Sequence, residues 1–268
     1  MRARAPRPGR RPRALFGKRV WPGVAARLAR TGVRLLLAFD LDGTLAPIVR
    51  DPARARVPIP TLRLLRRAVR LPRVTLAVLT ARRAREARRL VPVRGMKVAA
   101  QYGLEGPEPL GPALRRRWRR AASRIAPALR AIAAASPGAW VEHKGMTVAI
   151  HDRGVAPGRL RGLRRSVDRV AREALRLGFQ AVPGRRVTEF MPRGRNKGRA
   201  LTALRRRARA DEVFYFGDSG ADEPAFASLG PDDVSVRVGP GRTGARYRIR
   251  DPRGVSRFLR ALLSLRTP

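Results

Sequence analysis

Short apolar runs alternate with longer amphipathic stretches along most of the chain. The continuous apolar runs are typical of strands buried on both faces. They predict strands near residues 34–39, 74–79, 97–101, 187–191, 213–216 and 233–238. The amphipathic stretches predict helices near residues 59–71, 82–90, 196–207 and 255–265. Strands that alternate with helices predict a three-layer α/β fold built on a parallel sheet.

A segment in the middle of the chain interrupts this alternation. It contains a long helical stretch around 113–135, a predicted hairpin with Gly145 in its turn, a second helix around 158–177 and a strand near 179–182. Proline-rich connections on either side predict a separate inserted domain. The expected organisation is a basic, disordered extension over 1–30, a core domain formed by 31–106 and 186–268, and an inserted domain over 107–185.

The composition restricts the classes of protein and the cellular locations to be considered. The 268 residues include no cysteine, which excludes disulfides and thiolate metal sites, and no apolar run approaches the roughly 20 residues that span a bilayer. The beginning of the chain lacks the apolar core of a secretory signal. The expectation is therefore a cytoplasmic protein, away from membranes and monomeric.

The formal net charge of +42 raises the question of a nucleic-acid partner. The basic residues are spread over nearly every predicted helix, with no single stripe, and only four of the 61 are lysine. This distribution favours arginine-rich surface positions over a recognition surface. The expectation is non-specific binding to polyanions at low salt, fading steeply as salt rises, and no specific nucleic acid.

The first predicted strand runs directly into two carboxylates, Asp40 and Asp42, followed by Gly43 and Thr44. The carboxyl ends of parallel strands are where open α/β sheets place their ligands. One carboxylate can attack a phosphoryl group while the other handles a proton, provided that a hard cation such as Mg²⁺ screens the repulsion between the anions. The alternative is an acidic turn or an incidental surface cluster, which the apolar strand before it disfavours.

Three later segments supply the other groups such a site needs. Thr80 ends the second apolar strand, where its hydroxyl can bind a phosphate oxygen or simply cap the following helix. Lys197 opens a predicted helix and can neutralise a phosphate and a nucleophile. Asp218 and Asp222 follow the strand over 213–216 and offer the oxygen ligands that Mg²⁺ prefers.

These four segments, in this order, resemble the motifs of the haloacid dehalogenase superfamily of phosphohydrolases. The resemblance implies a three-layer, Rossmann-like core with a parallel sheet and a small inserted α+β cap domain. It further implies that Asp40 is the nucleophile, Asp42 the general acid and base, Thr80 the phosphate-binding hydroxyl and Lys197 the charge clamp. The implied ligands of Mg²⁺ are Asp40, Asp42 through its main-chain carbonyl, Asp218 and Asp222.

Within that superfamily, further segments resemble trehalose-6-phosphate phosphatases. They are the Leu-Ala-Pro-Ile stretch over 45–48, the Val-Glu-His-Lys-Gly stretch over 141–145 with the His-Asp-Arg over 151–153, and the Glu-Phe-Met-Pro stretch over 189–192. The resemblance implies hydrolysis of trehalose 6-phosphate through an aspartyl-phosphate. It also implies that the sugar phosphate is bound by Arg82, Glu142, Lys144, Arg153 and Glu189. By pattern alone, the water-exposed face of a hairpin is the favoured position for Glu142 and Lys144, and the resemblance reverses that preference.

Some positions depart from the family pattern. Ser219 stands where the fourth motif usually has a second aspartate, and Ala221 replaces a threonine. Loss of that carboxylate is expected to weaken the affinity for metal more than to abolish activity. Tyr102 and Asp152 differ on the predicted sugar side, which leaves phosphatases of glucosylglycerol, mannosylglycerate or sucrose phosphates as alternatives. A weakly active, polyanion-binding relative is the hypothesis from a different class.

Overall fold

The computed structural model describes residues 11–49, 51–106, 108, 110–184 and 186–266. Contacts between Cα atoms divide the chain into two compact units, which are described separately. One unit consists of Met1–Glu108 with Asn196–Pro268, and the other of Pro109–Arg195. They are called the core unit and the cap unit below.

The core unit is built on one parallel sheet of seven strands in the order β1-β11-β10-β9-β2-β3-β4. The strand β2 lies between β3 and β9, so its residues are covered by neighbours on both edges. The strands are β1 (Arg13–Ala14), β2 (Leu35–Asp40), β3 (Val74–Leu79), β4 (Lys97–Ala99), β9 (Glu212–Gly217), β10 (Val234–Val238) and β11 (Tyr247–Ile249).

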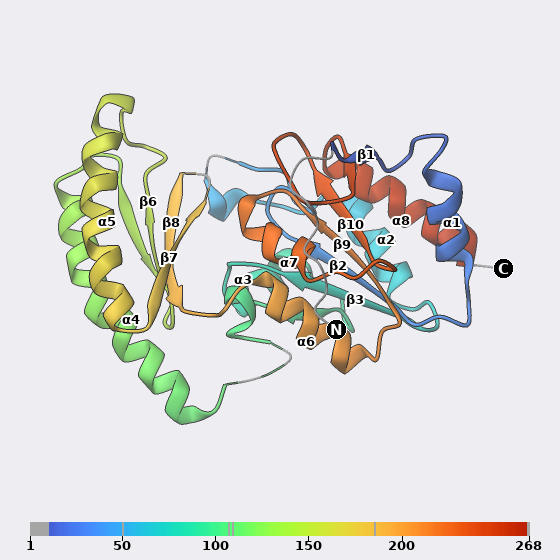
Figure 1. Cartoon of the computed structure of the whole chain (residues 1–268), viewed down its shortest axis with the longest axis horizontal. Coiled ribbons are helices and arrows are strands. Elements are labelled where there is room, and N and C mark those ends of the chain that lie inside the picture. Colours follow the sequence, from blue (N-terminus) through green and yellow to red (C-terminus); the bar gives the residue numbers. More distant parts are fainter. Residues whose placement is uncertain (1–10, 50, 107, 109, 185, 267–268) are drawn as a thin grey trace. The chain divides into compact units, whose positions relative to one another are not determined.

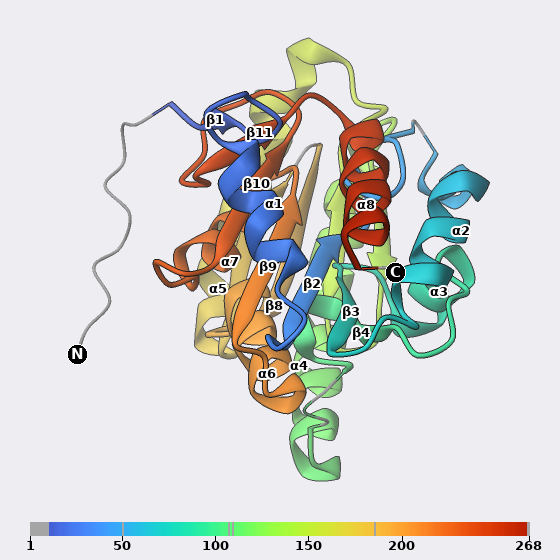
Figure 2. The same ribbon diagram turned by 90° about the vertical axis from the view of Figure 1, so that its right-hand side faces the viewer.

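Helices cover both faces of this sheet. Successive side chains of β2 point to opposite faces, so Leu35 and Leu37 pack in one apolar cluster while Leu36 and Ala38 pack in the other. Figure 2 shows α2, α3 and α8 on one side of the sheet, and α6 and α7 on the other. The helices of the core unit are α1 (Trp21–Ala29), α2 (Ile59–Ala68), α3 (Ala84–Leu90), α6 (Lys197–Ala208), α7 (Glu223–Ala227) and α8 (Pro252–Arg266), with short 3₁₀ turns η1 (Pro52–Arg54), η2 (Gln101–Gly103) and η4 (Gly220–Asp222).

The cap unit is an antiparallel sheet in the order β5-β6-β8-β7, packed against two helices (Figure 1). Its apolar cluster joins Val148, Ile150, Phe179 and Phe190 of the sheet to the inner faces of the helices. The elements are α4 (Pro112–Ala134), β5 (Trp140–His143), β6 (Val148–His151), η3 (Pro157–Arg159), α5 (Leu160–Arg176), β7 (Phe179–Gly184) and β8 (Val187–Pro192).

The parallel core sheet flanked by helices confirms the predicted fold class, and the hairpin of β5 and β6 turns at Gly145 as expected. One predicted core strand is assigned wrongly. The residues over 187–191 form β8, which pairs with β6 and β7 of the cap unit, so that unit ends at Arg195 and not at residue 185. An apolar run predicts a strand, but its partners are set by tertiary contacts that the run does not encode.

The prediction of a disordered extension over 1–30 is also wrong for the part that the structure describes. Arg13 and Ala14 pair with β11, and α1 packs its buried Val24 and Leu28 in the core cluster. Residues 1–10 lie outside the described residues. In the described part of the chain, no helix has the length and apolar character to cross a membrane.

Candidate active site

Asp40 lies at the carboxyl end of strand β2, and therefore at the carboxyl edge of the core sheet. Asp40 is the last residue of the strand and is buried, with 5% of its surface exposed. The chain then turns at Gly43, whose φ of +90° is unfavourable for other residues. A Cβ at Gly43 would lie 2.1 Å from Oδ2 of Asp218. Only glycine therefore allows the loop after β2 to approach the loop after β9 this closely.

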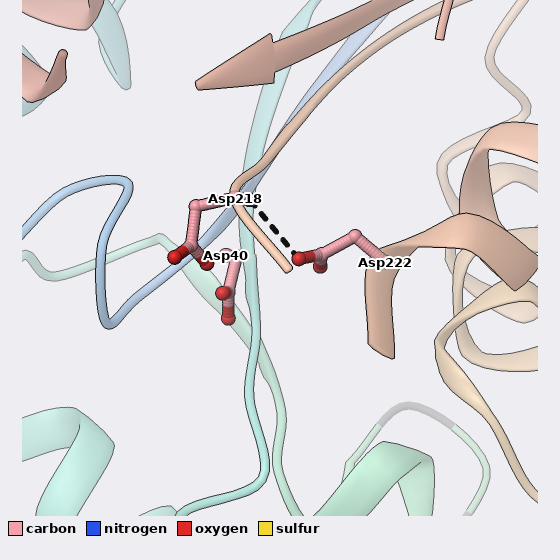
Figure 3. A group of neighbouring side chains, drawn as sticks. All are labelled: Asp40, Asp218 and Asp222. Carbon is pink, nitrogen blue, oxygen red and sulfur yellow. Dashed lines mark hydrogen bonds between the residues drawn. The ribbon is translucent and has the colours of Figure 1, made fainter. Parts of the chain in front are cut away.

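Two further carboxylates lie at the same edge of the sheet, in the loop that follows the neighbouring strand β9. Asp218 follows directly after β9, and Asp222 lies in the turn η4. Asp40, Asp218 and Asp222 each offer a carboxylate oxygen, and these atoms lie within 4.8 Å of one another (Figure 3). Three clustered carboxylates form a ligand set that suits a hard cation such as Mg²⁺.

Asp222 is held by five hydrogen bonds. Its Oδ1 accepts from Tyr215 Oη at 2.6 Å and from Lys197 Nζ at 2.7 Å. Its Oδ2 accepts from the main-chain N–H groups of Asp218 and Ser219 at 3.0 and 2.9 Å, and from the Ser219 hydroxyl at 2.9 Å. The Asp222 carboxylate therefore organises the loop that carries Asp218. Ser219, where the family pattern has an aspartate, contributes a hydroxyl to this arrangement.

Lys197 bridges the two strand-end loops. Its Nζ lies 2.6 Å from Oδ1 of Asp40 and 2.7 Å from Oδ1 of Asp222, and the residue is 2% exposed. The side chain starts from the first residue of α6, which Asn196 caps by accepting a hydrogen bond from the N–H of Arg199. Helix capping therefore fixes the point from which the ammonium group reaches the carboxylates.

The electrostatics of this cluster are unbalanced. Burial raises the pKa of the Asp40 carboxyl well above its usual range, and the charges of Asp222 and Asp218 add to this while Lys197 opposes it. Burial and the charge of Asp222 likewise raise the pKa of Asp218. The pKa of Lys197 is raised, because attraction to Asp222 and Asp40 outweighs its burial. A single ammonium does not neutralise three carboxylates, and a divalent cation would remove that excess of negative charge.

Thr80 follows β3, next to β2 in the sheet. Its Oγ1 accepts a hydrogen bond from the N–H of Arg82 at 3.1 Å, which is a local turn contact. The alternative that Thr80 caps the following helix is wrong, because α3 begins only at Ala84 and its N-cap is Arg83. A hydroxyl that accepts in this way still has its own proton to donate. The structural contact is therefore compatible with a second contact to a ligand oxygen.

Asp42 and Arg82 form an ion pair that the sequence did not indicate. The Nε of Arg82 donates to Oδ2 of Asp42 at 2.7 Å, and its Nη2 donates to Oδ1 at 2.8 Å. The same Nη2 donates to the main-chain carbonyl of Pro52 at 2.9 Å. The predicted acid and base and the predicted substrate-binding arginine are thus joined to each other.

Several polar side chains of the cap unit lie on one face of its sheet. Glu142, Ala149 and Glu189 are in register on adjacent strands, and therefore share the face opposite to Val141 and Ile150. Lys144 Nζ donates to Oε2 of Glu189 at 2.7 Å and lies 3.6 Å from Oε2 of Glu142. Three of the four predicted sugar contacts of the cap unit are therefore together.

His151 belongs to this polar face as well. Its Nε2 donates to Oε2 of Glu142 at 3.0 Å, and its ring stacks on Trp140 with 3.8 Å between the centroids. Burial opposes ionisation of Glu142, but the bond from His151 and the charge of Lys144 prevail and lower its pKa. The fourth predicted contact, Arg153, lies at an exposed position after β6, where its carbonyl accepts from Arg186.

Two residues that support the carboxylate cluster or its neighbours were not predicted from the sequence. Tyr215 lies in the middle of β9, and its sequence context predicts only an apolar strand residue. In the structure, its hydroxyl donates a hydrogen bond to Asp222. Pro52, whose carbonyl anchors Arg82, lies in the loop after β2. Alternation along β9 places Tyr215 on the face opposite to Phe214 and Phe216, which is the one signal that could have separated it from them.

The core unit combines a parallel sheet flanked by helices with a strand-end aspartate, a second carboxylate two residues later, a buried lysine and a late acidic loop. A solved haloacid dehalogenase-like hydrolase from Bacteroides thetaiotaomicron shares this fold, with a TM-score of 0.56 over 84% of this chain and 98% of that one, at 15% identity. The family model for trehalose-phosphatase matches residues 38–248, and the chain belongs to this family.

Similar curated proteins include trehalose-phosphate phosphatases and an uncharacterized glycosyl hydrolase. Trehalose-phosphate phosphatase of Mycobacterium ulcerans is 31% identical over 84% of this chain and 60% of its own length. An uncharacterized glycosyl hydrolase of Mycobacterium tuberculosis is 33% identical over 87% of this chain, but only 18% of its own length. The chain thus spans a small part of the first relatives and about three fifths of the mycobacterial phosphatases.

Solved structures of similar fold include the C-terminal domain of trehalose-6-phosphate phosphatase from Candida albicans. It has a TM-score of 0.75 over 95% of this chain and 98% of that one, at 20% identity. A trehalose-6-phosphate phosphatase related protein has a TM-score of 0.73 over 87% of this chain and the whole of that one, at 23% identity. At these identities the likeness concerns the fold.

Proposed function

We propose that the protein is a Mg²⁺-dependent phosphatase that hydrolyses trehalose 6-phosphate to trehalose and phosphate. The observation that carries the proposal is the cluster of Asp40, Asp218 and Asp222 around Lys197, at the carboxyl edge of a parallel sheet. Membership of the trehalose-phosphatase family and similarity to trehalose-phosphate phosphatases support the choice of substrate.

In this proposal Asp40 attacks the phosphorus of the substrate and carries the phosphoryl group as an aspartyl-phosphate. Asp42 gives a proton to the leaving sugar oxygen and later takes one from the attacking water. Lys197 holds Asp40 in place and offsets negative charge, and the Thr80 hydroxyl binds a phosphate oxygen. Both contacts of Lys197 are already formed.

A bound Mg²⁺ would supply electrostatic stabilisation of the phosphoryl oxygens. Asp40 and Asp218 would hold it together with the main-chain carbonyl of Asp42. The sequence also predicted Asp222 as a ligand. Its five hydrogen bonds favour a supporting role instead, because both of its oxygens are already engaged by donors.

The polar face of the cap unit provides groups that suit sugar hydroxyls. Glu189 is 3% exposed, and its Oε1 is buried without a hydrogen-bond partner within the described part of the chain. A buried carboxylate oxygen of this kind needs a donor, and a sugar hydroxyl can supply one. We propose that Glu142, Lys144 and Glu189 bind the sugar, with Arg153 at the periphery, and that the protein acts as a cytoplasmic monomer.

The experiment that tests the proposal is a substrate panel with released phosphate as the readout. Trehalose 6-phosphate, sucrose 6-phosphate and glucosylglycerol phosphate are compared side by side, with Mg²⁺ and with excess chelator. The expected result is release from trehalose 6-phosphate that requires Mg²⁺ and disappears in Asp40→Asn. Faster release from another sugar phosphate would keep the mechanism and change the substrate.

The opposite outcome is equally clear. Absence of phosphate release from every member of the panel, combined with tight binding to nucleic acid at physiological salt, would refute the phosphatase. It would favour the polyanion-binding alternative that the net charge of +42 suggests.

A further inference from the structure

The ion pair between Asp42 and Arg82 joins a fixed group to a more accessible one. The Arg82 side chain is 12% exposed, whereas that of Asp42 is 40% exposed. The guanidinium is further held by the carbonyl of Pro52 at 2.9 Å, and lies 3.9 Å from Oε2 of Glu86. Arg82 is therefore the more firmly held partner of the pair.

The main chain around Asp42 is also fixed. The N–H of Gly43 donates to the carbonyl of Ala46 at 2.7 Å, and the N–H of Ala46 donates to the carbonyl of Leu41 at 2.9 Å. The position of the Asp42 Cα is thus set by the turn, and the orientation of its carboxylate is set by Arg82. Two parallel N–H···O bonds of 2.7 and 2.8 Å define that orientation more tightly than one bond could.

We propose that Arg82 is a positioning residue that acts through Asp42, and not a contact for the sugar. The inference rests on the proposed phosphatase activity. As the Asp40 carboxylate forms its bond to phosphorus, the bond between phosphorus and the sugar oxygen breaks, and the Asp42 carboxyl transfers its proton to that oxygen. The proton transfer leaves a negative charge on Asp42, and the guanidinium of Arg82 is placed to receive it in the bidentate arrangement seen in this structure.

This role predicts a dependence on the leaving group. A sugar alkoxide is a poor leaving group and needs the proton of Asp42, whereas the nitrophenolate of p-nitrophenyl phosphate leaves without one. Arg82→Gln is therefore expected to lower kcat/KM for trehalose 6-phosphate by about 10- to 100-fold, and to change kcat/KM for p-nitrophenyl phosphate by less than about 3-fold. The quantity kcat/KM is chosen because it reports the step in which the leaving group departs, not the later hydrolysis of the aspartyl-phosphate.

Three further variants complete the test. Arg82→Lys keeps the charge but loses the bidentate geometry, and should recover part of the lost activity toward the sugar phosphate. Arg85→Gln removes an exposed charge from α3, the helix that begins two residues after Arg82, and should leave both substrates unaffected. In the background of Asp42→Asn, Arg82→Gln should have no further effect on the sugar phosphate, since the group through which it acts is absent. Thermal unfolding of each variant checks the fold, and Arg82→Lys carries the test if Arg82→Gln does not fold.

Specific outcomes would overturn the inference. Equal losses on both substrates would mean that Arg82 supports the fold or the phosphate. A raised KM for trehalose 6-phosphate with unchanged kcat would mean that it binds the sugar. Additive losses in the double variant would mean that it acts independently of Asp42. These results presuppose a wild-type protein that releases phosphate, and a wild type inactive on both substrates would instead refute the proposed function itself.

Discussion

The two polar clusters of this protein use the same kinds of side chain but differ in their balance of charge. In the core unit, the three carboxylates of Asp40, Asp218 and Asp222 surround one ammonium. In the cap unit, two carboxylates are matched by Lys144 and by a hydrogen bond from His151. The core cluster raises the pKa of two of its acids, whereas the cap cluster lowers the pKa of Glu142.

This difference separates two kinds of chemistry. A buried cluster with excess negative charge is stable only with a cation or with protons, and such a cluster suits catalysis on a phosphate. A balanced cluster needs no cation and can offer hydrogen bonds to neutral hydroxyls. The contrast supports the proposal that the reaction takes place at the core unit and that the cap unit binds the sugar, and the following variants test that proposal.

The largest effect is expected for Asp40→Asn. Phosphate release should fall by about 10³-fold or more, because the proposed nucleophile is removed. The melting temperature of the metal-free protein should stay the same or rise, since a buried carboxylate that two neighbours repel is replaced by a neutral group. Activity assays and thermal unfolding measure the two quantities. Glu142→Gln is the matched cap variant and should keep the chemistry while weakening binding; equal losses in kcat would contradict the assignment.

The next effect concerns the two buried lysines. Lys197→Met leaves the core carboxylates without their counter-charge, and should lower the free energy of unfolding by about 3–5 kcal/mol in the absence of metal. Lys144→Met should have a smaller effect, because it deprives one buried carboxylate, Glu189, of its counter-charge while Glu142 keeps its bond to His151. Urea denaturation of both variants measures the difference. A larger loss in Lys144→Met would show that the charges of the cap unit, and not those of the core unit, are the unbalanced ones.

Magnesium should stabilise the core cluster specifically. Mg²⁺ at about 100 times its Kd is expected to add about 2.7 kcal/mol to the free energy of unfolding of the wild type, which appears as a higher melting temperature. Asp218→Asn should lose most of this increase, whereas Glu189→Gln should retain it. The comparison fails if both variants lose the increase equally.

The smallest effect is a pH dependence that has opposite signs in the two units. The pKa of Glu142 is lowered from 4.5, so its contribution to stability is present above that pH and is lost as the pH falls through the lowered pKa. The pKa of Asp40 is raised from 3.8, so stability is lost as the pH rises from that value through the raised pKa. In metal-free protein, Glu142→Gln should therefore cost up to about 1 kcal/mol near pH 6, and this cost should disappear as the pH falls through the lowered pKa.

The matched core variant gives the opposite trend. Relative to wild type, metal-free Asp40→Asn should become more stable as the pH rises above about 4, since it lacks the carboxyl that must ionise in a buried site. Chemical denaturation at a series of pH values measures both differences. The same sign for both variants would refute the contrast in charge balance.

The sequence anticipated most of the core, because its signals are local. The apolar run that ends in Asp40 and the acidic loop that begins at Asp218 predict both strands and their carboxyl ends. The parallel order of the strands then brings these ends to one edge, which explains why a cluster so far apart in the sequence could be expected. The strand β8 was assigned to the wrong sheet because the sequence of an apolar strand does not specify the strand with which it pairs.

Residue types and their order along the chain were thus enough to predict the α/β class, the four motifs and the candidate residues. Only the tertiary structure decided which groups touch. It joined Asp42 to Arg82, surrounded Asp222 with donors that include Tyr215, and placed His151 against Glu142. Hydrogen bonds and charge interactions act over a few ångströms, between side chains that the sequence separates by 40 positions in the pair of Asp42 and Arg82 and by far more in the pair of Asp40 and Lys197. Their partners are therefore fixed by packing and strand register, which no local pattern contains.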